Sequence, residues 1–553
     1  MKSVKRSLAI LLVAALFISL LAGCGSSKPA ETNQPSSGSS DSGSSAPATS
    51  APAAVTAPPK VTAPPTPEPE AEVKYADSLD VVCDNNPISN LDPAVPASLS
   101  PGTYYALIMT HDTLVTSLGD GEYAPNLATE WSTDDYITFN FKLRDDIVFD
   151  NGEKMTAEDV VYTCKHSQDG PGSPGAGQWS PVETITAKGD YEVEMVLKEM
   201  NVTFLFNLSN IMTCILNKKA CEANAETGPW VGTGAFKVTE FLAGDHVTMV
   251  RSDSYAGDPA PTRQITLRYV PETSTRTIMM QNKEYQLSFG IGNDDAALFQ
   301  NDPEFVVIPE LANNPQGLQF NMDDPIVGDI NLRKAFLYGI DREEICIVAR
   351  GDWAMPPADG TIWGYETEFR NSSIPVIPHD EEKAKEYLAM SSYKGEPVEI
   401  SVGNPTNVLV AETIQRQLEP LGINIVINSM DTPSLNAYNQ WGNNKSQITA
   451  ASFGFNMSAS SANNLYLPGG SNNRSQYNNP EVADLLNQAK LEGDAAKRGE
   501  LYKKVQELVA EDLPGAQMLW LVLTVVATKN LGGWVIPSDT YAVDLRGLYE
   551  IVE

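Results

Sequence analysis

Apolar and polar residues alternate in two stretches of the chain, and each alternation predicts a half-buried strand. The stretch "ITFNFKL" at 137–143 places Ile, Phe, Phe and Leu on one face, and "YEVEMVL" at 191–197 does the same with Tyr, Val, Met and Leu. Between them, "MTAEDVVYT" has Thr156 three residues before Asp159, which is close to a capping box. This pattern predicts a helix that ends near Lys165.

A strand, a helix and a second strand follow one another further along the chain. "PVEISV" at 397–402 and "INIVI" at 423–427 are strand-like, and "LVAETIQRQLEPLG" at 409–422 carries its apolar residues at helical spacing. Gly422 is placed to end that helix. We expect a right-handed unit with the two strands parallel.

Two helices are predicted near the C-terminal end. Asn479 is an N-cap with Pro480 at the first helical position. The next helix carries its apolar residues in register, at Leu501, Val505 and Leu508. Together with the earlier elements, this order of strands and helices makes the body an α/β protein.

The first 23 residues read as a secretory leader. Lys2, Lys5 and Arg6 precede an almost wholly apolar stretch, 8–21, which is shorter than the ~20 residues that a membrane-spanning helix needs. The leader ends in "LAGC", which resembles the bacterial lipobox, so Cys24 is expected to be lipidated. The alternative is an ordinary signal peptide with an incidental cysteine.

Residues 24–78 are rich in Ser, Gly, Ala, Pro and Thr and have few large apolar side chains. Such a composition cannot bury enough surface to offset the entropy of ordering. We expect a tether that holds a folded body near the outer side of the cell membrane, as on a Gram-positive-type surface.

Composition narrows the remaining possibilities. The body is too long for one core, because single cores stop growing near ~250–300 residues. A formal net charge of −33 argues against a nucleic-acid partner. Five cysteines remain beyond Cys24, and an odd, sparse set is no disulfide framework; they are Cys83, Cys164, Cys214, Cys221 and Cys346. Whether Cys214 and Cys221 pair is left open.

Catalytic and metal-binding patterns are absent from the sequence. The four histidines are scattered, and no HExxH, GxSxG or P-loop occurs. Ser391 and Lys394 match S-x-x-K, but neither of the accompanying motifs follows, so this match is attributed to chance. We expect no enzyme activity, no cofactor and no metal.

Several stretches, in order, resemble the family 5 extracellular solute-binding proteins, the oligopeptide, dipeptide and nickel type that serves ABC importers. They are "NLDPAVPAS", "APNLATEWSTDDYITFNFKLRDDIVFDNGEKMTAEDVVYT", "VGTGAFKV", "LQFNMDDPIVGDINLRKAFLYGIDREEI", "YNNPEVADLLNQA" and "LPGAQMLW". Ala235 and Phe236 stand where the family has Pro and Tyr, and Gly339 replaces an Ala.

The resemblance implies a type II periplasmic-binding-protein-like fold, a three-domain flytrap with a hinge between two lobes. Domain I would comprise 79–120, 230–310 and 521–553. Domain II would be an insertion at 121–229, and domain III would span 311–520. A solute would bind between the lobes, and closure would bury it.

In peptide-binding members, a Trp-x-x-Asp segment supplies a carboxylate for the ligand's free amino group. Here Phe453 takes the aromatic place and Asn456 takes the place of the acid, and no Asp or Glu occurs at 445–476. The resemblance therefore casts doubt on an ordinary peptide ligand, unless Asp294 or Asp295 supplies the charge. The Asn- and Ser-rich segment suits an oligosaccharide equally well, although most such stretches are solvated loops.

Other ligand contacts are proposed on aromatic character and position. These candidates are Tyr104, Tyr105, Asn293, Trp363, Trp441 and Trp520. The alternative for each aromatic residue is a place in the core, above all for Trp520, which lies in an apolar run.

The resulting hypothesis is a monomeric, lipid-anchored receptor that delivers an oligopeptide or oligosaccharide to an ABC importer permease. A sensor or chaperone-like binding lipoprotein on the same fold is the alternative, and the sequence does not separate the two. A surface enzyme would need a clustered nucleophile and base, which the sequence does not display.

Overall fold

The computed structural model describes the body of the chain, namely residues 74–83, 87–98, 100–119, 121–289, 291–311, 315–364, 367–455, 458–535 and 543–552. The chain divides into two units, Met1–Glu70 and Ala71–Glu553, and every described residue belongs to the second. The predicted signal peptide, the anchor at Cys24 and most of the tether lie outside the described residues.

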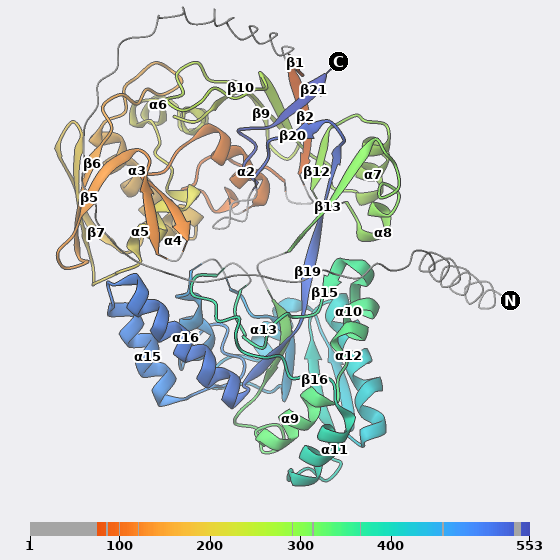
Figure 1. Cartoon of the computed structure of the whole chain (residues 1–553). Helices are drawn as coiled ribbons and strands as arrows, with labels where there is room; N and C mark the ends of the chain where they lie inside the picture. The colour runs from red at the N-terminus through yellow and green to blue at the C-terminus, as the bar shows by residue number, and fades with distance from the viewer. Residues whose placement is uncertain are drawn as a thin grey trace, which may run out of the picture. The chain divides into compact units, whose positions relative to one another are not determined.

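One sheet of twelve strands runs through the body (Figure 1). Its path is β17 (Ile425–Ser429), β16 (Val398–Val402), β18 (Ile448–Ser452), β14 (Gln316–Phe320), β19 (Gly515–Thr528), β12 (Leu287–Phe289), β2 (Ser78–Cys83), β11 (Gln264–Tyr269), β10 (His246–Arg251) and β9 (Phe236–Leu242). Two further strands pair with β19 beside this path, β13 (Phe305–Leu311) and β15 (Ala354–Met355).

The long strand β19 joins the two halves of this sheet. Its first part pairs antiparallel with β14, and its second part pairs antiparallel with β12 and β13. β13 and β14 both pair antiparallel with β19, one after the other, so two antiparallel segments connect the halves: β13 with β14, and β19. We call these two segments the crossing. β19 buries residues in cores on both sides of the crossing, which explains its nearly continuous apolar sequence.

Four helices cover the half that contains β14 and β16–β18. They are α9 (Ile330–Tyr338), α10 (Arg342–Arg350), α11 (Glu381–Met390) and α12 (Pro405–Leu418). β16 and β17 are parallel on either side of α12, and Gly422 adopts a φ of 83° after the helix, so the predicted parallel pairing and the end of the helix are confirmed. Together with this half of the sheet, the helices enclose one apolar core.

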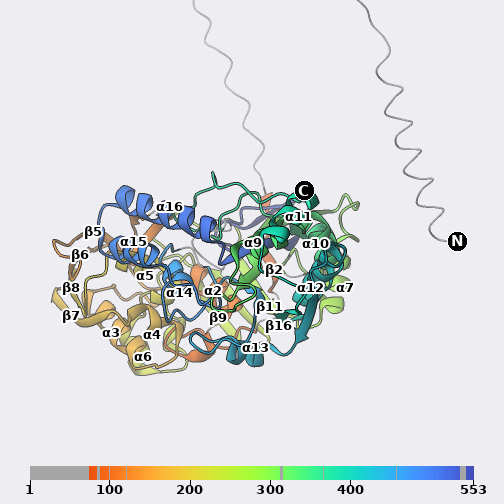
Figure 2. The ribbon, with the colours of Figure 1, turned by 90° about the horizontal axis from the view of Figure 1, so that it is seen from below.

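A second helical group packs beside that half. It comprises α14 (Ser461–Tyr466), α15 (Pro480–Leu491) and α16 (Ala495–Asp512), whereas α13 (Thr432–Tyr438) lies against β16. Asn479 caps α15 by accepting hydrogen bonds from Glu481 N and Val482 N, which confirms the predicted start. Val482, Leu486 and Val505 belong to its core. Figure 2 shows α14, α15 and α16 side by side.

The other half of the sheet carries α2 (Pro101–Thr110), α7 (Thr273–Gln281) and α8 (Asn293–Ala296). β2 is parallel to both β11 and β12. Near the C-terminal end, β1 (Lys74–Tyr75), β21 (Tyr549–Val552) and β20 (Leu531–Gly532) form a small antiparallel sheet. Two cores lie in this half, and Trp353 from the other half packs into one of them.

A separate antiparallel sheet lies within residues 121–229. Its order is β5 (Ala128–Ser132), β6 (Thr138–Leu143), β8 (Glu192–Leu197) and β7 (Val182–Gly189). Its helices are α3 (Ala157–Gln168), α4 (Pro174–Trp179), α5 (Phe204–Ser209) and α6 (Lys218–Ala223), and the hairpin β3 (Val115–Gly119) and β4 (Glu122–Pro125) precedes it. Both predicted strands and the Thr156–Asp159 capping box are confirmed.

Two glycines of the "VGTGAFKV" stretch explain its structural role. A Cβ at Gly232 would lie 1.9 Å from Thr110 O, and one at Gly234 would lie 2.5 Å from Thr110 C. Both positions therefore require glycine, because the chain passes too close to the backbone at the end of α2 to leave room for a side chain. The domain boundaries predicted from the resemblance stay predictions.

The five cysteines beyond Cys24 are all buried free thiols, so Cys214 and Cys221 are not paired in this structure. Burial raises the pKa of both thiols, that of Cys221 to about 12. Neither thiol is therefore a reactive thiolate near neutral pH. Among the helices of the described residues, none has the length and apolarity required to cross a membrane.

Candidate functional site

An open groove of about 810 Å³ lies where the two halves of the long sheet meet beside the crossing. One wall comes from α7 and α8, with Thr273, Gly292, Asp295 and Ala297, and the other comes from the end of α10 and the turn after it, with Ile347, Val348, Ala349, Arg350, Gly351 and Trp353. Since the walls belong to different halves, a change in the angle between the halves would change the width of the groove.

The groove combines charged groups with an apolar wall. Asp295 stands on one side, where its Oδ2 accepts a hydrogen bond of 2.7 Å from Thr277 Oγ1, and Arg350 stands on the other. Ile347 is 68% exposed and Val348 is 42% exposed, although both are large apolar residues. Such a groove can hold a small solute that has polar groups and an apolar body.

Trp363 and Phe453, both proposed as ligand contacts, lie together in the buried aromatic cluster of the α14–α16 group. Trp363 is fully buried, its Nε1 donates a 2.8 Å hydrogen bond to Glu368 O, and its ring lies 5.0 Å from that of Phe455. Burial raises the pKa of the neighbouring Tyr502 to about 12, so this phenol stays neutral.

Two charged residues next to this cluster were missed from the sequence. Glu368 is buried, and its carboxylate accepts a 3.2 Å hydrogen bond from Ala459 N, at the edge of the Asn- and Ser-rich segment. Arg370 forms a buried ion pair with Asp359 at 2.9 Å and lies 5.3 Å from the Trp520 ring centre. The sequence "TEFRNSS" has no periodicity that would signal burial of its charges.

The remaining candidates are spread over the body. Tyr105 on α2 is buried with its ring 5.4 Å from Phe289, at the end of the strand that leads towards Asn293. Tyr104 packs partly buried against the same core. Asn293 begins α8, but its side chain lies outside the described part of the structure, as do Asp294's side chain and the whole of Asn456.

Trp441 lies in a turn after α13 and is half-buried, whereas Trp520 is buried in β19. The structure thus brings Trp363 and Phe453 together and places Arg370 over Trp520, but it does not gather all the candidates in one cavity. The role of each as a ligand contact stays a prediction.

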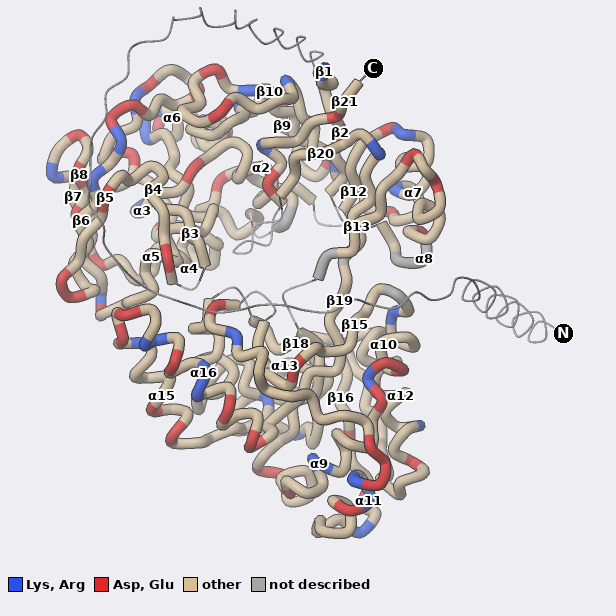
Figure 3. Tube along the Cα trace, in the orientation of Figure 1, with Lys and Arg blue, Asp and Glu red and all other residues tan. Residues whose placement is uncertain are grey.

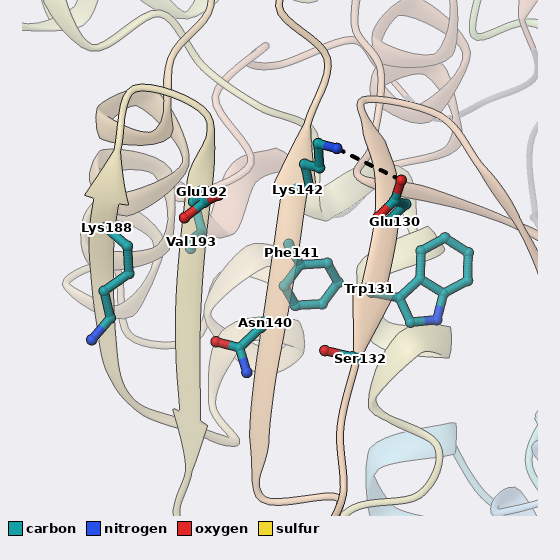
Figure 4. Close-up of a pocket in the computed structure, with 9 residues that line it drawn as sticks. All are labelled: Glu130, Trp131, Ser132, Asn140, Phe141, Lys142, Lys188, Glu192 and Val193. Atoms are coloured by element: carbon teal, nitrogen blue, oxygen red, sulfur yellow. Dashed lines mark ion pairs between the residues drawn. The ribbon is translucent and has the colours of Figure 1, made fainter.

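A second hollow, of about 290 Å³, lies on the outer face of the separate sheet (Figure 4). Both lysines of its lining are paired across strands, with Lys142 Nζ 3.7 Å from Glu130 Oε1 and Lys188 Nζ 2.7 Å from Oε1 of the neighbouring Glu194. This is the solvated face of an antiparallel sheet, and we do not treat it as the binding site.

Features associated with catalysis or metal binding do not assemble in the described ranges. No group of three or more His, Cys, Asp or Glu side chains there could hold a metal ion. Ser391 of the S-x-x-K match is the C-cap of α11, and its hydroxyl donates to Leu388 O at 2.7 Å, an ordinary helix end.

Solved structures with the same arrangement are binding proteins. HbpA2 from Haemophilus parasuis aligns with a TM-score of 0.77 at 19% identity, over 86% of this chain and 100% of that one. The unliganded open form of MppA, a periplasmic murein tripeptide binding protein, aligns with a TM-score of 0.75 at 18% identity, over 87% and 99%. The fold is therefore that of the periplasmic binding proteins, as the sequence predicted.

The sequence comparisons define the family. The chain belongs to the bacterial extracellular solute-binding proteins, family 5, whose middle-region model matches residues 122–477. Dipeptide-binding protein DppE of Bacillus subtilis is 27% identical over 446 residues, covering 72% of this chain and 79% of the relative. Heme-binding protein A of Haemophilus influenzae is 24% identical over 466 residues, covering 76% and 83%. Membership makes the chain a solute-binding protein and not an enzyme, which confirms both expectations.

Proposed function

We propose that the chain is a lipid-anchored extracytoplasmic receptor that captures a peptide-like or oligosaccharide-like solute between two lobes and delivers it to an ABC importer permease. The observation that carries this proposal is the groove of about 810 Å³ whose walls come from opposite sides of the crossing. Two antiparallel segments make a hinge, so the lobes can close on a solute and release it at the permease.

The chemistry of the site leaves two solute classes to compare. A buried ammonium needs an opposing charge, and the missing Coulomb energy would be about 4 kcal/mol at a 4 Å separation with an effective dielectric of 20. The segment 445–476 has no acid to provide it, which favours a neutral solute. Asp295 in the groove is the candidate carboxylate if the solute is a free-amine peptide.

Calorimetry decides between these classes, after mass spectrometry of any solute that co-purifies. A panel of free-amine peptides and of β-glucan and xylan oligosaccharides would be titrated into the protein and into an Asp295→Asn variant. Peptide binding that weakens in the variant supports the carboxylate role, and sugar binding that does not change supports a neutral solute. Steady conversion of the bound solute into a product would contradict the proposal of a receptor.

The membrane anchor is tested separately. The lipobox-like "LAGC" after a cationic and apolar leader motivates the assignment of Cys24 as the lipidated residue. A Cys24→Ser variant should leave the membrane fraction while keeping its affinity for the solute. If the variant stays in the membrane fraction, Cys24 is not the anchor.

A further inference from the structure

Residues 121–199 contact the corner between α15 and α16. This contact joins two parts of the body that are far apart in the sequence, and it is separate from the crossing. Lys490 Nζ lies 3.3 Å from Glu199 Oε1. The second partner is Tyr136, because a Cβ built on Gly493 would lie 2.1 Å from its hydroxyl oxygen. In both ribbon views α15 lies next to the β5–β6 edge of the separate sheet (Figures 1 and 2).

Backbone geometry on the insertion side favours a role for this contact. Tyr136 has a φ of 54°, in the left-handed region that costs a residue with a side chain about 1 kcal/mol or more. The corner is held by Thr133 Oγ1, which accepts from Tyr136 N at 2.9 Å, and by Asp135 Oδ1, which accepts from Ile137 N and Thr138 N. This conformation directs the Tyr136 ring to Gly493.

Arg498 forms the third part of the contact and continues it inward. A Cβ on Gly121 would lie 2.3 Å from Arg498 Nη2, so the guanidinium is in contact with the edge of the insertion. The same guanidinium lies 5.7 Å from the ring centre of Phe369 and donates to Glu492 O at 2.9 Å. Arg498 is only 4% exposed, so this arrangement is well packed.

Phe369 connects Arg498 to the buried aromatic cluster and to the segment 458–461. It also has a left-handed backbone, with a φ of 59°, and its ring stacks on Tyr502 at 5.8 Å. The preceding residue, Glu368, holds Ala459 N through its carboxylate. A displacement of Arg498 would therefore be passed to the start of the segment 458–461.

We propose that Gly121, Tyr136 and Glu199 on one side and Lys490, Gly493 and Arg498 on the other form a closing contact that holds the lobes together, and that Arg498 is a positioning residue for the segment 458–461. The proposal rests on the proposed function, because it assumes that the lobes open and close. It gives the insertion a role in setting the balance between the open and the closed form.

The individual interactions fit a contact that forms and breaks. The Glu199–Lys490 pair is exposed, and exposed ion pairs contribute little each. Acidic and basic residues are interspersed along α15 and α16 (Figure 3), so the surface is not strongly attractive over a long range. A weak contact can shift the balance between two forms without locking the protein closed.

The test introduces a side chain where only glycine fits. Gly493→Val keeps an ordinary backbone, because Gly493 is not among the glycines with positive φ, but its side chain would collide with Tyr136. We expect at least a threefold loss of the closed form. Tyr136→Ala removes the ring that the new side chain would meet, so adding Gly493→Val to Tyr136→Ala should cause no further loss. Gly177→Val is the matched control, since a Cβ there meets no atom within 4 Å.

The readout is energy transfer between dyes on Glu183→Cys and Glu500→Cys, which are exposed, in a protein whose described native cysteines are buried. It is measured without any solute and with the peptide and sugar panels. No change in transfer for Gly493→Val, or the same change whether Tyr136 is present or replaced by Ala, overturns the proposal. Should Gly493→Val fail to fold, Glu199→Lys and its rescue by Lys490→Glu replace it, with the same two outcomes.

This design separates the closing contact from the proposed function. If Gly493→Val changes the energy transfer but the wild type binds none of the probes, the closing contact is supported and the proposed receptor function is contradicted. A protein that binds a probe with unchanged affinity and unchanged transfer in the variant supports the receptor and contradicts the contact. If Arg498 is a positioning residue, Arg498→Lys should weaken probe binding while the melting temperature stays close to that of the wild type.

Discussion

His111 should make the protein sensitive to acid. Its side chain is fully buried next to Gly232, and its Nδ1 lies 2.8 Å from Thr110 Oγ1, while its Nε2 has no hydrogen-bond partner among the described residues. Burial lowers the pKa of His111 from 6.5 to about 4, because the charged imidazolium would lose its hydration.

The sign and size of the effect follow from linkage. Below about pH 6.5 the unfolded chain binds a proton at His111 that the folded protein does not bind until about pH 4. The stabilising contribution of the neutral, buried His111 is therefore complete above pH 6.5 and is lost as the pH falls to about 4. At about 1.4 kcal/mol per pH unit, the loss amounts to about 3 kcal/mol.

The assay is urea unfolding at a series of pH values from 4 to 8, for the wild type and for His111→Gln. The free energy of unfolding of the variant should fall less steeply between pH 6.5 and 4. The change in free energy over this range should differ between the two proteins by about 3 kcal/mol. His379→Gln, at an exposed position, is the control and should follow the wild type. A His111→Gln curve parallel to the wild type would refute the reasoning.

Three further predictions concern charge and packing. Burial raises the pKa of Asp150 to about 6, so the charged carboxylate destabilises the fold at neutral pH, the opposite of the effect of His111. Asp150→Asn should therefore raise the free energy of unfolding at pH 7.5 by about 1–2 kcal/mol in urea titrations. The variant should also lack the increase in stability that the wild type shows when the pH falls from 6 to 4. Arg370→Met should lower the free energy of unfolding by about 3–5 kcal/mol, because it leaves Asp359 buried without its charged partner. Calorimetric melting measures the loss, and an unchanged melting temperature would show that the pair does not stabilise the fold. Trp363→Ala should lower the free energy of unfolding by about 3–5 kcal/mol, whereas Trp441→Ala, in a half-buried turn, should lower it by under about 1 kcal/mol. Equal losses of the two variants in denaturant unfolding would contradict the assignment of Trp363 to the core.

Local elements were predictable because their signals are local. The capping box at Thr156, the αL glycine at 422 and the cap at Asn479 each depend on residues a few positions apart, and all three occur as expected. The parallel pairing of β16 and β17 followed from the short helix between them, since a crossover of that kind leaves little choice of handedness.

The candidate site was less predictable because its residues meet only through long-range packing. Arg498 touches Phe369 and Gly121 across more than a hundred positions of sequence, and nothing in the pattern around any of the three indicates the others. Glu368 and Asp359 are buried although they are charged, and charged residues are seldom fully buried, so their types give no sign of it. Trp363 lies in a stretch without periodicity, so its burial became clear only with its neighbours.

The position of β19 in the chain has a consequence for the order in which the protein is completed. This strand is synthesised near the end, yet it lies between β14 and β12 in the long sheet and supplies buried side chains to three cores. A nascent chain that lacks residues 515–528 can therefore complete neither half of that sheet. The pairings of β19 with β12, β13, β14 and β15 must wait until translation is nearly finished, which slows folding and leaves those strand edges unpaired for longer.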